Sequence, residues 1–170
     1  NTYITAMPQL HEGITNLDHT FEYCRELKEV TPLPASISSV NYTFASSGIE
    51  ETPKFLELNP SYDELHMTFA YCKNLESVNT LPNVNSLYGT FYEAFVSGYD
   101  ASELVIPETV TDMNSSFRLS RILSPPRLPK GIKNIDYAFD SCGSLKATPL
   151  LPEGLESANH AFSHCYNIEF

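Results

Sequence analysis

The sequence has no tryptophan, only seven glycines against twelve prolines, and ten basic against 21 acidic residues. The resulting net charge of −11 argues against a nucleic-acid ligand, because phosphate backbones are held by clustered lysine and arginine. No apolar run approaches the roughly 18 residues of a membrane span. The motifs of P-loops, zinc proteases, serine hydrolases and dinucleotide-binding folds are also absent. These absences predict a chain that is not an enzyme, has no cofactor and does not insert into a membrane.

The chain does have enough apolar material for one core. Its 170 residues, 42% of them hydrophobic, predict one folded domain over residues 1–170 and exclude a disordered segment. It begins at Asn1, and no charged segment followed by an apolar stretch is visible there as a secretory signal. We interpret the sequence as a fragment of a longer repeat protein.

A phenylalanine preceded by a small residue recurs at intervals of 22–26 residues along the chain. We number positions in the repeat from this phenylalanine; apolar residues stand at positions −7 and −4, and leucine or isoleucine stands at +6 in most copies. One such unit cannot bury its apolar side chains alone, whereas stacked units bury one another's. The phenylalanines that we expect in the core are Phe21, Phe44, Phe69, Phe91, Phe117, Phe139 and Phe162.

Two segments carry a family resemblance, HTFEYCRELKEVTPLPASI (19–37) and YAFDSCGSLKATPLLPEGL (137–155). They resemble BspA-like leucine-rich repeats, a family found in large surface proteins of bacteria and of some parasitic protists. The resemblance is poor at 92–128. It implies a solenoid, a right-handed leucine-rich repeat coil of about seven repeats with one short parallel strand per repeat. It also implies adhesion, in an extracellular or cell-surface location.

Under this interpretation, each strand follows the leucine of its repeat. The predicted strands are residues 28–32, 76–80 and 146–150. Alternation along a strand would point Val30 and Pro32 inward and Glu29 and Thr31 outward. Strands stacked in parallel at about 4.8 Å would form a curved sheet with one open face. We take that open sheet face as one candidate binding surface, carrying Glu29, Thr31, Ser77 and Asn79.

The cysteines share repeat position +3 and are Cys24, Cys72, Cys142 and Cys165. Recurrence at one position indicates packing, because a free thiol behaves as a small buried hydrophobe. Cys24 and Cys72 lie two coils apart, about 10 Å on the strand spacing, too far for a disulfide. Cys142 and Cys165 lie one coil apart, and a bridge between them stays open. His160 and His164 have zinc-like spacing only in a helix, so we predict exposed histidines and no metal site.

A second candidate binding surface comes from charge. No acid occurs between Asp112 and Asp136, where five bases fall, namely Arg118, Arg121, Arg127, Lys130 and Lys133. The stretch overlaps the irregular repeats at 92–128, and departures of this kind mark loops on one face of a solenoid. It is either a patch for an acidic partner or a solvated loop with unrelated charges.

We therefore predict a non-enzymatic interaction module of a cell-surface or secreted protein that binds a protein or a glycan. The alternative is a structural spacer that holds other domains apart and has no ligand. A glycan-processing enzyme would need a carboxylate pair in a cleft, for which the periodic sequence gives no sign. Exposed aromatic residues on one surface, such as Tyr88, Tyr92 and Tyr99, would favour binding over a spacer.

Overall fold

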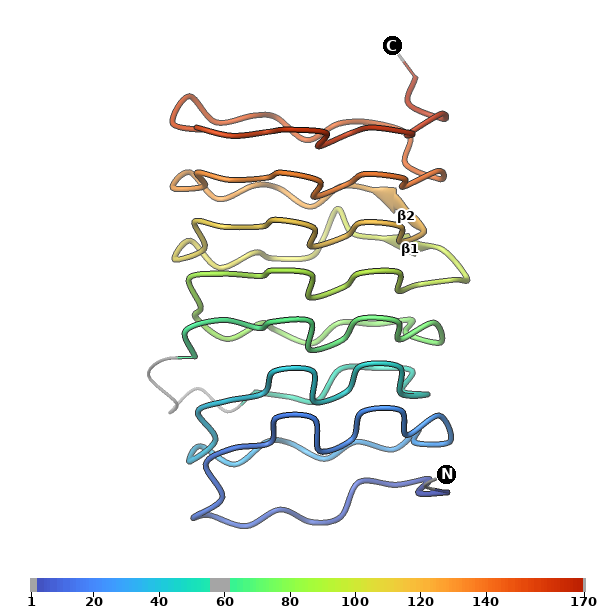
Figure 1. Cartoon of the computed structure of the whole chain (residues 1–170), viewed down its shortest axis with the longest axis vertical. Helices are drawn as coiled ribbons and strands as arrows, with labels where there is room; N and C mark the ends of the chain where they lie inside the picture. Colours follow the sequence, from blue (N-terminus) through green and yellow to red (C-terminus); the bar gives the residue numbers. More distant parts are fainter. Residues whose placement is uncertain (1–2, 56–61, 170) are drawn as a thin grey trace.

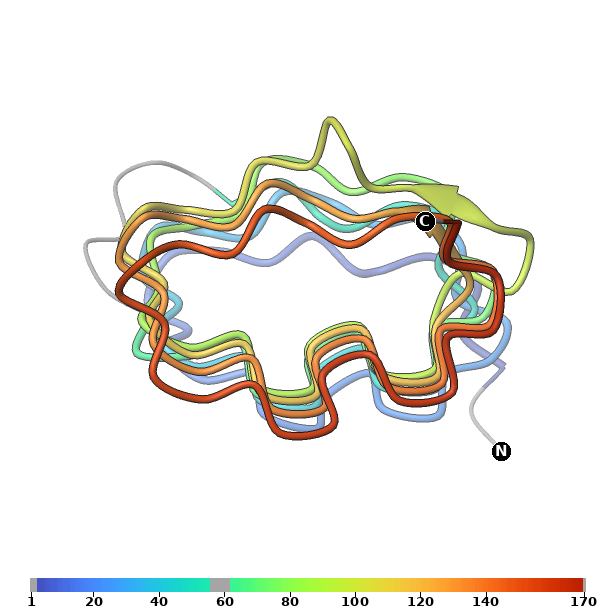
Figure 2. The same cartoon turned by 90° about the horizontal axis from the view of Figure 1, so that it is seen from above.

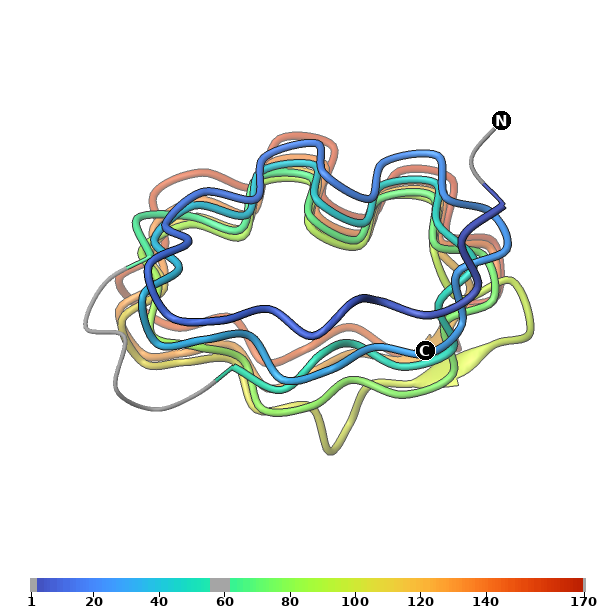
Figure 3. The ribbon, with the colours of Figure 1, turned by 90° about the horizontal axis from the view of Figure 1, so that it is seen from below.

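The computed structural model describes residues 3–55 and 62–169, which wind into a stack of flat coils with the two chain ends at opposite ends of the stack (Figure 1). The predicted domain, residues 1–170, also includes 1–2, 56–61 and 170, which lie outside the described residues. Seen along the stack, each coil has a notched side and a smoother return side (Figures 2 and 3). Around residues 99–100, within the irregular stretch, the return side bulges beyond the outline of the other coils (Figure 2).

The described residues contain two named strands, β1 (Tyr99–Asp100) and β2 (Ile122–Ser124), which pair in parallel on the return side (Figure 2). Elsewhere, isolated parallel bridges join neighbouring coils, as between Ala6 and Glu29 or Glu51 and Ser77. Of the predicted strands, 28–32 and 76–80 are thus reduced to single bridged residues. Residues 146–150 form neither strand nor bridge in the described structure.

The predicted alternation is wrong because buried residues recur at every third position rather than every second. Cys24, Leu27 and Leu33 are buried, Val30 is half-buried, and Pro32 is exposed. Successive turns produce this period, since the amide of Leu27 donates to the carbonyl of Cys24 at 3.0 Å. Proline has no amide hydrogen to donate into a strand ladder, so the proline-rich return side cannot form continuous strands.

A regular ladder of backbone hydrogen bonds runs instead along the notched side. In nearly every coil, the amides at positions −4, −2, 0 and +2 donate to the carbonyls at −5, −3, −1 and +1 of the next coil. The amide of Phe21, for example, lies 2.9 Å from the carbonyl oxygen of Thr43, and that of Tyr23 lies 2.8 Å from that of Ala45. The main cross-coil ladder therefore lies opposite the predicted strands.

The notches are tight turns with an unusual backbone. One turn is closed by a bond from the amide at −1 to the carbonyl at −4, and the other by a bond from the amide at +3 to the carbonyl at 0. The third residue of each turn has a positive φ, a conformation that favours glycine or asparagine. The residues concerned are His19, Tyr23, Tyr42, Ser46, Met67, Tyr71, Gly89, Glu93, Ser115, Leu119, Tyr137, Ser141, His160 and His164.

The core is a ladder of phenylalanine rings between the two sides. Neighbouring rings are stacked with centroids 5.3 to 5.8 Å apart. All seven are buried except Phe162, in the last described coil, which is half-buried. The buried threonines at position −1 donate their hydroxyls to carbonyls inside the core; that of Thr43, for example, donates to the carbonyl of Leu17 at 2.8 Å.

The four cysteines are free thiols, so Cys142 and Cys165 are not bridged in the structure. The thiols of Cys72, Cys142 and Cys165 donate to the carbonyl oxygen of the phenylalanine one coil earlier, at 3.0, 2.9 and 3.0 Å. Burial raises the pKa of Cys72 and of Cys142 to about 12, because a thiolate there would lose its hydration. These cysteines are packing residues that also satisfy a backbone acceptor.

Candidate functional site: the notched side

A row of rings follows the first notch, at positions −2 and −3, in which His19 and Tyr88 are exposed and Tyr42 and His66 are half-buried. Ring centroids lie 4.9 Å apart between His19 and Tyr42, 5.3 Å between Tyr42 and His66, and 4.8 Å between His66 and Tyr88. The phenol oxygen of Tyr42 is also 3.3 Å from His66 Nε2. We call these four residues the first ring row. It repeats with the coils because every coil turns outward at the same place.

A second ring row follows the other notch, at positions +1 and +2, and contains Tyr23, Tyr71 and Tyr92. The rings of Tyr71 and Tyr92 have centroids 5.4 Å apart. The guanidinium of Arg118 extends the row, 6.0 Å from the centroid of Tyr92 and 5.1 Å from that of Tyr137. Such cation–ring contacts are attractive because the face of the ring is negative.

Asp140 links three coils beside the second row. Its carboxylate is 2.9 Å from Arg118 Nε, 3.2 Å from His164 Nδ1 and 3.1 Å from the hydroxyl of Ser141. Burial favours the neutral acid, but the bonds from His164 and Ser141 and the charge of Arg118 outweigh it. The pKa of Asp140 is therefore lower than that of an ordinary aspartate.

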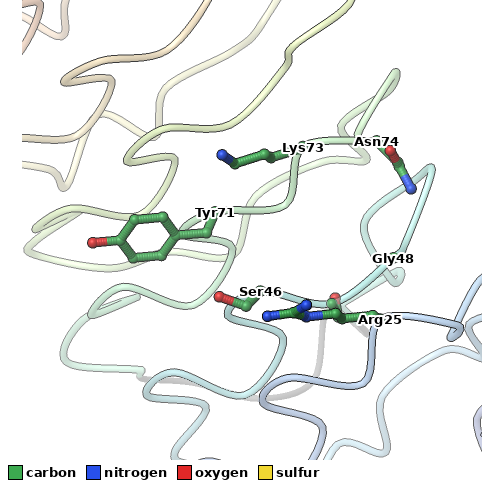
Figure 4. A pocket seen from close by; sticks show the side chains of 7 residues that line it. Arg25, Ser46, Gly48, Tyr71, Lys73 and Asn74 are labelled. Atoms are coloured by element: carbon green, nitrogen blue, oxygen red, sulfur yellow. The ribbon is translucent and has the colours of Figure 1, made fainter. Parts of the chain in front are cut away.

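A recess opens among the coils of Phe21, Phe44 and Phe69, next to the second row (Figure 4). Its volume is about 460 Å³. Arg25, Lys73 and the ring of Tyr71 surround it, and its floor comes from the coil of Phe44 (Figure 4). The complete lining is Arg25, Ser46, Ser47, Gly48, Tyr71, Lys73 and Asn74.

The five bases of the predicted basic stretch do not gather on one side, because residues 118–133 run around most of a coil. Arg118 lies on the notched side against Asp140, whereas Arg127 lies on the return side, 3.9 Å from Glu108. Lys133 pairs with Glu156 at 2.9 Å. Arg121 and Lys130 are exposed. Acids from neighbouring coils thus face three of the five bases.

The predicted open sheet face lies on the return side. Glu29 and Ser77 are exposed, and Thr31 is half-buried with a hydroxyl that bonds to no described group. The side-chain amide of Asn79 is used internally, because it donates to the carbonyl of Thr52 at 2.5 Å. Three further acids, Glu50, Glu51 and Glu76, share a shallow groove with Glu29 and one base, Lys28, so this surface is acidic.

Sequence reasoning named Tyr88 and Tyr92, which lie on the notched side, but missed most of the ring rows and the whole recess. Tyr99 lies apart from them on β1, with its ring stacked 4.5 Å from that of Phe95. The missed signal was the recurrence of rings at positions −3, −2 and +2 from the core phenylalanine.

Two kinds of site find no support in the described residues. No three His, Cys, Asp or Glu side chains within residues 3–55 and 62–169 lie together as a metal site would require. His160 stacks on Tyr137 with centroids 5.0 Å apart, and His164 contacts Asp140 instead. The same part of the chain has no helix with the length and hydrophobicity to span a bilayer.

Comparison with known families decides the classification. The BspA-type leucine-rich repeat region matches residues 9–117 and 90–170, with six copies. The chain belongs to the BspA-type leucine-rich repeat family. The resemblance of segments 19–37 and 137–155 is thereby confirmed, and the irregular stretch 92–128 falls within the match. Members of this family are typically surface repeat proteins, and the repeat is generally a non-enzymatic module. No curated protein and no solved structure matches the chain.

Proposed function

We propose that this BspA-type chain is a right-handed, seven-coil segment of a longer cell-surface or secreted protein, where it acts as an adhesion-type interaction module. It binds a protein or glycan ligand through the notched side. The two ring rows carry this proposal, since exposed apolar and aromatic patches on a rigid surface mark interaction sites. A structural spacer without a ligand would not need rows of aromatic rings on its surface.

The chemistry of the recess agrees with binding rather than catalysis. Acid–base catalysis by carboxylates requires acids in a cleft, and the residues that line this recess include none. The ring rows present wide amphipathic faces with few rotatable bonds, which lose little conformational entropy on binding.

The test is a binding screen of the immobilised chain against glycans and extracellular-matrix proteins, followed by two matched triple variants. Tyr42→Ser, His66→Ser and Tyr88→Ser together remove three rings of the first row. Val105→Ser, Leu150→Ser and Leu151→Ser together remove exposed apolar side chains elsewhere. Thermal unfolding of both proteins verifies that they remain folded.

We expect the ring-row variant to lose at least tenfold in affinity for any ligand found, and the second variant to keep it. Equal affinities would move the site away from the first ring row. A third variant, Arg118→Ser, Arg121→Ser and Arg127→Ser, then tests the basic stretch, where binding should also weaken as salt rises. Absence of any ligand from the screen would support the spacer instead.

A further inference from the structure

The recess beside the second ring row exists because one coil carries small residues where its neighbours carry large ones. At position +2, the coils on either side have Tyr23 and Tyr71, whereas the coil of Phe44 has Ser46. At position +4, the neighbours have Arg25 and Lys73, and this coil has Gly48. Two missing side chains in one coil leave the cavity between two intact ones.

The floor of the recess is held by the backbone. The amide of Gly48 donates to the carbonyl of Cys24 at 3.1 Å, and a Cβ at position 48 would overlap the carbonyl oxygen of Arg25. The coil therefore approaches its neighbour too closely for any residue but glycine. The recess is a built feature of the stack, and its volume of about 460 Å³ lies within the range of small-ligand pockets.

The lining presents hydrogen-bond donors and positive charge on a chain whose net charge is −11. The Arg25 side chain forms no ion pair with any described acid, whereas Lys73 is held by Glu93 at 2.9 Å. The hydroxyl of Ser46 and the amide of Asn74 add neutral polar groups, and Tyr71 adds a ring (Figure 4). An arginine fork matches a carboxylate with two parallel hydrogen bonds, while hydroxyls, an amide and a ring suit a sugar.

We propose that this recess binds a carboxylate-bearing sugar unit of an acidic glycan. Arg25 binds the carboxylate, Lys73, while paired with Glu93, offers a hydrogen-bond donor on the opposite wall, and the Tyr71 ring packs against the C–H face of the sugar. The inference rests on the proposed function, since it names the ligand class of the same notched side.

The probe is a tetrasaccharide of alternating glucuronate and N-acetylglucosamine, titrated by calorimetry. Its methyl ester, which has no carboxylate charge, and a tetrasaccharide bearing sulfate instead of carboxylate are measured in parallel. Arg25→Gln removes the fork. Ser46→Tyr fills the recess with the residue found at position +2 in both adjacent coils, whose backbone there also has a positive φ. Ser141→Tyr makes the same change at the same repeat position, outside the recess.

We expect the glucuronate probe to bind the parent chain and to weaken with salt. Arg25→Gln should weaken it at least tenfold, Ser46→Tyr should abolish binding, and Ser141→Tyr should leave it unchanged. Equal binding of the methyl ester, or equal or tighter binding of the sulfated probe, would overturn the carboxylate assignment. Glucuronate binding that survives Ser46→Tyr would overturn the location. If the parent chain does not bind the glucuronate probe but binds another ligand through the ring rows, the recess is not a site for acidic sugars. The proposed function would still hold in that case.

Discussion

At the scale of single residues, glycine occupies repeat position +4 in two coils but is required in only one of them. Gly48 and Gly143 both stand there. At Gly48 the backbone of the previous coil leaves no room for a side chain, whereas a Cβ at Gly143 would meet no atom within 4 Å. Only the first glycine is required by a close approach.

Gly48→Ala should therefore destabilise the chain by about 1–3 kcal/mol or more, since backbone atoms cannot yield as a flexible side chain would. Gly143→Ala should be neutral or stabilising by up to about 1 kcal/mol, because alanine restricts the unfolded chain. Denaturant melts of both variants measure the free energy of unfolding. Equal effects would contradict the packing described for the coil of Phe44.

The buried cysteines make a second prediction at this scale. Burial raises the pKa of Cys72 and Cys142 from 9.0 to about 12, so the folded chain keeps protons that the unfolded chain releases. Their contribution to stability is complete below pH 9 and is lost as the pH rises toward 12.

Replacing both with serine, the residue that occupies this position at Ser47 and Ser120, should flatten the loss of stability between about pH 8.5 and 10.5. Urea melts at several pH values compare the parent with the double variant. Lysines and tyrosines titrate in both proteins, so the difference between the two slopes reports the thiols. Parallel slopes would show that these thiols ionise freely in the folded chain.

At the scale of elements, the stack is built from turns rather than strands. The predicted core phenylalanines and cysteines are buried in phase with the repeat, except that Phe162 and Cys165 of the last described coil are half-buried. The sequence could not predict the notches, because tyrosine, histidine and serine carry no signature of positive φ as glycine and asparagine do. The cross-coil bonds at Phe21 and Tyr23 hold that conformation in place, and such bonds appear only once the coils are stacked.

A glycine at one of these turn positions should stabilise the chain. Ser46 has a φ of 59°, which costs a non-glycine residue about 1–2 kcal/mol. Ser46→Gly should raise the free energy of unfolding by about 0.5–1 kcal/mol after the entropy cost of glycine. Ser97→Gly, at an exposed turn position without positive φ, should lower it by about 0.5 kcal/mol. Thermal and urea melts measure the stability of both variants. A lower free energy of unfolding in both would mean that the left-handed turns carry no strain.

At the scale of the whole molecule, the functional surfaces are assembled across coils, which limits what a linear sequence shows. The run from Arg118 to Lys133 is continuous in sequence, yet it circles the stack. The recess combines Arg25, Ser46 and Lys73 from three coils, and it arises partly from side chains that are small. Small residues that replace large ones at one repeat position are recognised only when the sequences of neighbouring coils are aligned.

Asp140 allows a test of coupling between coils. Because its pKa is lower in the folded chain, the carboxylate of Asp140 stabilises the fold. This stabilisation is complete above the unfolded-state pKa of about 3.9 and is lost as the pH falls through the lower pKa of the folded state. Asp140→Asn should therefore reduce stability at pH 7, and the gap to the parent should shrink as the pH falls below about 4. Urea melts from pH 7 to about pH 2.5 follow both proteins. A constant gap across this range would show that the carboxylate charge is not what links the coils.

The ladder on the notched side also has an electrostatic consequence. Its amides at positions −4, −2, 0 and +2 point from one coil to the next in the same direction, from the coil of Phe21 to that of Phe139. Aligned peptide dipoles add, as they do along a helix. This side of the stack thus carries a lengthwise dipole whose positive end faces the chain's C-terminal coil. Anionic groups are favoured at that end, independently of any side-chain charge.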